Sequence, residues 1–205
     1  MSGIQMALLG TGSVFTPVTN TYTSGTAATE TVPSGATQVV ITVDGGGAAG
    51  GFNNTTLGGG GGGAGRAIKT IAVVGGNTMT YTVAAAIAGR GSQGVGTNGN
   101  SSSVTGTVSG GSVSISVSSA FGGGINNGGS AGIATGGDTN TSGNVGVSGT
   151  IDGDGGDAAS GAIGGVYTVT IDGANPGAGG GGSGQDAGFI TSGAGARGQI
   201  SFAYT

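Results

Sequence analysis

The sequence has no Cys, no His and no Trp, and only 6% of its residues are charged. Without His and Cys the chain lacks the usual general base, the thiol nucleophile and the preferred zinc ligands. Its four cations, Arg66, Lys69, Arg90 and Arg197, do not cluster, although binding a phosphate backbone needs several basic groups on one face. These absences exclude most ordinary enzyme classes and argue against direct nucleic-acid binding. We expect no enzymatic activity and no cofactor.

Long apolar runs are also missing, and no stretch is long enough to cross a bilayer. The first ten residues have neither the basic region nor the long apolar stretch of a secretory signal. We therefore expect no membrane insertion, and release from the cell by lysis rather than by export.

Glycine is the residue that the chain has in excess, with 55 among 205 residues. Collagen is excluded, because the spacing of the glycines is irregular and there are only three Pro. Disordered chains combine high net charge with few β-branched residues, whereas this chain has a net charge of −4 and is rich in Val, Ile and Thr. The composition indicates an ordered protein.

Alternation of apolar and polar residues is the strongest local pattern, and it is typical of strands with one buried face. Helix signals are nearly absent, because Gly costs about 1 kcal/mol per helical position relative to Ala. Only the segment 83–88 has a helix-like composition. The pattern predicts an all-β fold. The clearest strands are expected at 39–43, 78–83, 112–117, 167–171 and 200–204, with weaker ones at 14–18, 67–73, 104–108 and 145–151.

Glycine tracts separate these strands, notably at 58–63, 122–124 and 179–182. Such tracts are either flexible linkers or packed segments in a left-handed helix of three residues per turn, where neighbouring backbones hydrogen-bond. We favour packed tracts. On that interpretation Gly61→Val should cost about 1 to 3 kcal/mol or more, and Gly25→Val, outside any tract, should cost less.

Carboxylates offer two further hypotheses. A carboxylate pair could hydrolyse a glycoside, but the eight acidic residues include Asp44 and Asp172, which precede Gly and are better explained as turn residues. Asp152, Asp154 and Asp157 are weak candidates for Ca²⁺, because Gly156 stands where a third ligand of an EF-hand loop belongs. We expect polar loops and no metal.

The order of several segments resembles the glycine-rich domain of bacteriophage tail and tail-fibre proteins. The segment 33–43 is followed by a glycine tract, by 65–69 and by 75–83, and the chain closes with 195–204. The sequence departs from that family by having Asp44 where an aromatic residue is common. The resemblance implies a glycine-rich β-sandwich or jelly-roll-like domain over 33–205, with packed loops that in some members form polyglycine II helices. Residues 1–32 are then an N-terminal arm or docking strand.

The same resemblance implies a virion structural protein, extracellular after host lysis, that contributes to host attachment. Its partners would be other virion proteins and a host-surface glycan or outer-membrane protein, in an oligomer or larger assembly. Aromatic and amide side chains suit such a surface. The candidate binding residues are Phe52, Asn53, Asn54, Phe121, Asn126, Asn127 and Phe189. The alternative for each Phe is a place in the buried core, because the chain has only nine aromatic rings. The alternative is a capsid decoration or head-fibre protein that cements neighbouring subunits; an ice-binding protein or a bacterial surface protein fits less well.

Overall fold

The computed structural model describes residues 14–149, 153–166, 172–184 and 191–205. The chain is all-β, as predicted, with two five-stranded antiparallel sheets and one two-stranded parallel pair. None of the described residues is helical, so none belongs to a helix long and apolar enough to cross a membrane. The segment 83–88 follows the strand that ends at Thr82 and is not helical either.

The first sheet has the strand order β1-β12-β3-β5-β10. Its central strands, β12 and β3, run antiparallel with Phe202 opposite Ile41. The edge strand β1 pairs with β12 along its full length. The bounds of the five strands are Val18–Tyr22 (β1), Gln199–Tyr204 (β12), Gln38–Asp44 (β3), Arg66–Ala72 (β5) and Thr139–Thr141 (β10).

The second sheet has the order β2-β6-β7-β8-β9. Its centre is the hairpin of β7 and β8, in which Val104 lies opposite Ile115. Both β1 and β2 come from the segment 1–32, and each is the edge strand of one sheet. The bounds are Ala28–Thr31 (β2), Thr78–Thr82 (β6), Ser102–Val108 (β7), Gly111–Val117 (β8) and Ala134–Thr135 (β9).

The core lies between these two sheets and is formed by the apolar faces of the alternating strands. The side chains predicted to point inward from 79–83 and 113–117 are buried, as are Ile200, Phe202 and Tyr204 at the end of the chain. The expected strands at 39–43, 67–73, 104–108 and 200–204 correspond to β3, β5, β7 and β12. The residues 145–149 are not a strand, the segment 14–18 contributes only Val18, and 167–171 lies outside the described residues.

One carboxylate is buried inside this sandwich. Glu30 on β2 is 3% exposed and accepts hydrogen bonds from Asn20 Nδ2 (2.8 Å), Tyr22 Oη (2.6 Å) and Tyr204 Oη (2.8 Å). Its three donors belong to β1 and β12 of the opposite sheet, so Glu30 connects the two sheets. The hydrogen bond to Glu30, helped by burial, raises the pKa of Tyr22 to about 12. Burial and the same carboxylate also raise the pKa of Tyr204.

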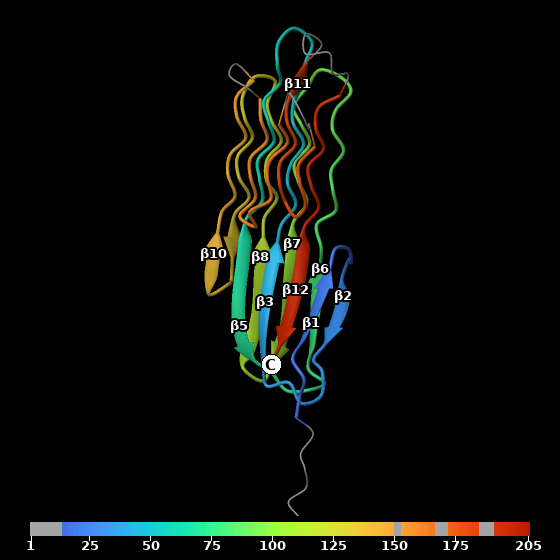
Figure 1. Ribbon diagram of the computed structural model, residues 1–205, viewed down its shortest axis with the longest axis vertical. Helices are drawn as coiled ribbons and strands as arrows, with labels where there is room; N and C mark the ends of the chain where they lie inside the picture. The colour runs from blue at the N-terminus through green and yellow to red at the C-terminus, as the bar shows by residue number, and fades with distance from the viewer. Residues whose placement is uncertain (1–13, 150–152, 167–171, 185–190) are drawn as a thin grey trace, which may run out of the picture.

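Beyond the strands the chain continues as a bundle of extended segments that run side by side along the long axis (Figure 1). These segments contain the glycine tracts. Backbone hydrogen bonds join them with a period of three residues: Gly59 and Gly62 donate to Gly124 and Phe121, both on the segment 121–124. Three residues per turn is the period of the polyglycine II helix, which makes no internal hydrogen bonds. The tracts are therefore part of the folded structure.

The tract 58–64 lies at the centre of this bundle. It donates backbone hydrogen bonds to the segments 121–124, 144–147 and 177–180, and it accepts them from 45–51, 129–132 and 156–159. Six neighbouring segments thus surround one tract, and from Gly59 to Ala64 each amide donates to, and each carbonyl accepts from, one of them. Because unpaired buried backbone groups are costly, this arrangement lets a glycine tract be buried without forming a sheet.

Side chains are excluded from the central tract by the neighbouring backbones. A Cβ added at any of Gly58 to Gly63 would collide with a backbone carbonyl of another segment. In the outer segment 143–149, by contrast, Gly143, Gly146 and Gly149 face inward at every third position, and Val145 between them is exposed. Glycine therefore stands where a segment faces its neighbours.

Candidate functional site

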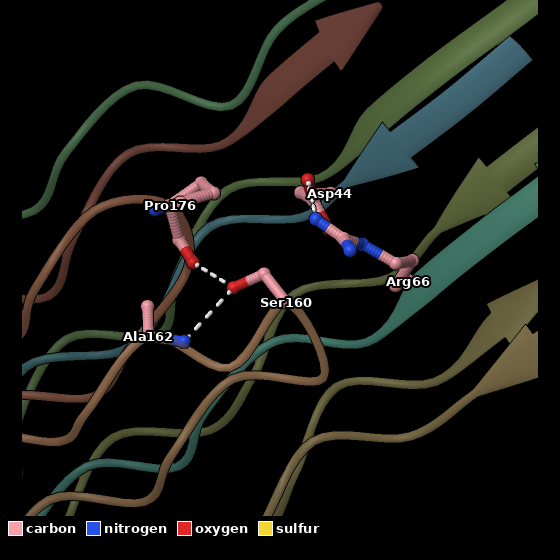
Figure 2. Close-up of polar contacts among 5 residues, drawn as sticks. All are labelled: Asp44, Arg66, Ser160, Ala162 and Pro176. Atoms are coloured by element: carbon pink, nitrogen blue, oxygen red, sulfur yellow. Dashed lines mark hydrogen bonds and ion pairs between the residues drawn. The ribbon is translucent and has the colours of Figure 1, made fainter.

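An ion pair between buried Asp44 and half-buried Arg66 marks the junction where β3 and β5 pass into the glycine bundle (Figure 2). Arg66 donates from Nε to Asp44 Oδ1 (2.7 Å) and from Nη2 to Asp44 Oδ2 (2.9 Å), and the two residues are partners in the register of β3 and β5. These hydrogen bonds raise the pKa of the Arg66 guanidinium. Asp44 is the last residue of β3 and is 3% exposed, so its interpretation as a turn residue is wrong.

A second polar contact holds the lower end of the bundle, close to this ion pair. The Ser160 hydroxyl donates to the Pro176 carbonyl oxygen (2.7 Å) and accepts from the Ala162 amide (3.3 Å), as Figure 2 shows. It links the turn at 158–161 to the loop at 174–177. The ion pair thus joins the ends of β3 and β5 where the bundle begins, and Ser160 joins two loops at the base of the bundle.

At that far end, three loops are connected by side-chain amides. The strand β4 (Phe52–Asn53) pairs in parallel with β11 (Ser183–Gly184), and the chain turns at 54–56. Asn53 Nδ2 donates to Asn126 Oδ1 (2.8 Å) and to Thr56 Oγ1 (2.7 Å), while its Oδ1 accepts from the Thr55 amide (3.1 Å). Asn54 Nδ2 donates to Gln93 Oε1 (3.2 Å) in the third loop. We call the exposed side chains of Asn54, Thr55, Gln93, Asn126 and Asn127 the distal amide surface.

The structure corrects several of the residues predicted from sequence. Phe52 and Asn53 were candidates for the binding surface, but they are 3% and 4% exposed: Phe52 is buried inside the bundle, the alternative for each Phe, and Asn53 holds the loops together. Asn54, Asn126 and Asn127 are exposed at the far end, as expected. Phe121 is exposed (52%) but lies on the side of the bundle. It precedes Gly124 by one turn of three residues and is therefore about 9 Å closer to the sandwich. Phe189 lies outside the described residues.

The acidic candidates lie on the side of the bundle. Asp154 and Asp157 are three residues apart, and both line a groove of about 330 Å³ together with Val145, Ile163 and Val166. Asp157 Oδ1 accepts from the Gly164 amide (2.8 Å). Asp152 lies outside the described residues. Within the described part of the chain, no three acidic side chains gather in a group that could hold a metal ion.

Sequence reasoning did not identify Thr55, Gln93 and Thr56 in the distal loops. The only sequence feature that distinguishes them is that they are polar residues in a short segment between glycine tracts. Many other residues of the chain have the same feature. No protein-family model matches this chain, and no curated protein is significantly similar to it.

The arrangement favours binding over catalysis on chemical grounds. The distal amide surface consists of amides and hydroxyls, which donate and accept hydrogen bonds but have no pKa near neutrality. Such groups recognise sugar hydroxyls or peptide groups, and the bonds among the loops hold them in place before a ligand arrives. A preordered surface loses less entropy on binding than a flexible one.

Proposed function

We propose that this chain is a non-enzymatic structural protein of a bacteriophage virion, a tail or tail-fibre component that binds the host surface through the distal amide surface. The observation that carries the proposal is the position of that surface. Its loops are joined by hydrogen bonds of Asn53 and Asn54 where β4 ends, and β4 pairs with β11 at the end of the bundle farthest from the sandwich (Figure 1). A binding surface at the tip of a rigid rod can reach a cell before the rest of the protein does.

The sandwich end supports the same proposal. Its sheets provide a compact core, and β3 and β5 are continuous in sequence with the bundle segments 45–51 and 58–64. This division of labour suits a protein that is attached to a larger assembly at one end and meets a ligand at the other. The ligand would be a host glycan or an outer-membrane protein, and the place of action would be the virion outside the lysed cell.

Binding to cells tests the proposal. The labelled protein would be screened against a panel of bacterial strains, and a strain that retains it would be used for variants. We expect Asn54→Ala with Gln93→Ala to reduce retention at least about tenfold, because both amides would be lost from the surface. The matched control is Ser112→Ala with Ser114→Ala, two exposed residues of β8 on the sandwich. Equal retention of both double variants would contradict a binding role for the distal end.

A second function is favoured by one observation, the exposed apolar side chains on the side of the bundle. Val145 is 65% exposed and Ile163 is 66% exposed, and both line the same groove. Contiguous exposed apolar surface commonly marks a protein interface. A capsid decoration or head-fibre protein that cements neighbouring subunits would bury it. Val145→Ser with Ile163→Ser should then abolish incorporation into virions while leaving the melting temperature unchanged.

A further inference from the structure

A second groove, of about 340 Å³, lies on the sandwich where it meets the bundle, away from the distal amide surface. Three segments form it: the loop 23–26 between β1 and β2, the segment 83–86 after β6, and Arg197 just before β12. Its volume falls within the range of about 300 to 1,000 Å³ that is usual for small-molecule sites. Nothing in the proposed function uses this groove.

The lining of the groove combines one cation with hydroxyl groups. Thr23, Ser24 and Thr26 contribute hydroxyls, and within the described part of the chain none of these hydroxyls is hydrogen-bonded to protein. Val83, Ala85 and Ala86 provide an apolar wall. No carboxylate lines the groove, in contrast to the groove of Asp154 and Asp157.

Arg197 is the notable member of this set, because the chain carries twice as many acidic as basic residues. Arg66 and Lys69 have carboxylate partners, Asp44 and Asp138. Among the described residues, none provides a carboxylate to Arg197, whose side chain is exposed. A guanidinium can hold a carboxylate through two parallel hydrogen bonds, which gives both strength and orientation.

The backbone around the groove is held rigidly on each side. The Gly25 carbonyl accepts from the Val83 amide (2.9 Å), and the Ala27 amide donates to Thr82 Oγ1 (3.1 Å). Arg197 donates its amide to Asn175 Oδ1 (3.2 Å) and accepts at its carbonyl from Gly177 (2.8 Å). The backbone that carries the lining side chains is therefore ordered without a ligand, which reduces the entropy lost on binding.

We propose that this groove binds a carboxylated saccharide of the uronic-acid class. Arg197 holds the carboxylate, the hydroxyls of Thr23, Ser24 and Thr26 bind sugar hydroxyls, and Ala85 and Ala86 contact the apolar face of the ring. The three kinds of group present in the lining match the three kinds of surface on such a sugar. This inference does not depend on the assignment of the distal end, nor on the chain being a virion protein.

The test is a titration of the full chain with D-glucuronate, D-glucose, acetate and inorganic phosphate, followed by nuclear magnetic resonance. We expect D-glucuronate to shift backbone signals of 23–26 and 83–86 at concentrations where the other three compounds do not. Arg197→Gln should weaken the apparent affinity at least about tenfold. Arg90→Gln, which removes an arginine outside the groove, should leave it unchanged. The melting temperature of Arg197→Gln should match that of the parent chain, because the side chain is exposed.

Three results would overturn the proposal. One is equal affinity of the parent chain and Arg197→Gln for D-glucuronate. Another is binding of acetate or phosphate as tight as that of D-glucuronate, which would reduce the site to an anion site. The third is no shift at 23–26 with any of the four compounds. The same titration on Asn54→Ala with Gln93→Ala should give parent-like affinity, so failure of the groove and failure of the distal surface are read separately.

Discussion

Gly61 is the position at which the packing of the glycine tracts can be tested most directly. It lies in the middle of the central tract, and its amide donates to the Gly180 carbonyl (2.8 Å). A Cβ at this position would overlap the carbonyl oxygen of Ala48 and lie 2.7 Å from that of Ala49. Both atoms are backbone, so no side-chain rotation can relieve the collision. Gly61→Ala adds this one carbon, and Gly61→Val adds two more.

The cost follows from what must move. Displacing Ala48 lengthens two hydrogen bonds, the one from its amide to Gly62 (3.1 Å) and the one from Gly180 to its carbonyl (2.9 Å). Each such bond contributes about 0.5 to 1.5 kcal/mol net. Overpacking adds about 1 to 3 kcal/mol. We therefore expect Gly61→Val to lose about 2 to 6 kcal/mol of unfolding free energy, which for a domain of this size lowers the melting temperature by roughly 4 to 24 °C.

The matched control is Gly124→Ala in a neighbouring tract. Its added Cβ would approach no atom closer than the Asn127 carbonyl oxygen, at 3.1 Å. We expect a change near zero, because the tight contact opposes the small gain from restricting the unfolded chain. Gly25 is a poor control, contrary to the expectation from sequence: its φ is +139°, and an added Cβ would lie 2.7 Å from the Tyr81 ring. Equal melting temperatures for Gly61→Ala, Gly61→Val and Gly124→Ala would refute the packed-tract reasoning.

Three further predictions concern the charged groups. Arg66→Gln should lower the free energy of unfolding, measured in urea, by about 3 kcal/mol, because it leaves the buried Asp44 without its cation. Lys69→Gln should cost at most about 1 kcal/mol, because its partner Asp138 is 56% exposed and lies at the longer distance of 3.6 Å. In the unfolded chain Tyr22 ionises near pH 10, but in the folded chain its pKa is raised to about 12. The contribution of this hydroxyl to the free energy of unfolding should therefore be fully present below pH 10 and be lost between pH 10 and 12. Tyr22→Phe should reduce that slope, and an unchanged slope would contradict the assignment. EDTA should leave the melting temperature almost unchanged. A cation present at a concentration of a hundred times its dissociation constant would stabilise the protein by about 2.7 kcal/mol, and its removal would lower the melting temperature visibly.

The sandwich could be predicted from sequence because its signal is local. Val113, Ile115 and Val117 alternate with Ser, and that period alone places them on one face of a strand. Asp44 shows where local reasoning fails: Asp-Gly is a common turn dipeptide, yet here it ends a strand, because Arg66 on the neighbouring strand is its partner. The sequence pattern within 39–45 does not indicate that Arg66 is the partner of Asp44.

Phe52 and Asn53 were misplaced for a related reason. A Phe followed by two Asn residues after glycine is a pattern typical of an exposed loop. The burial of Phe52 depends on the segments that surround it, including Gly94, whose backbone exchanges hydrogen bonds with that of Phe52. Composition does not indicate contacts between segments about 40 residues apart. The sequence therefore predicted loops of the distal surface, but not which of their side chains are exposed.

The three-residue period also determines where function can be placed in the bundle. The central tract has neighbours on all sides and is glycine from 58 to 63, whereas 143–149 has glycine only at the inward positions. Large side chains of the outer segments therefore lie on the outward faces, and the bundle interior holds mainly glycine and small alanine side chains such as Ala48, Ala49 and Ala178. A deletion of one residue between Gly143 and Gly146 would turn each following side chain by a third of a turn and bring Val147 to the inward position of Gly146. The bundle thus tolerates substitution at Val145 or Ile163, and longer loops at its far end, but not a change of register along a tract.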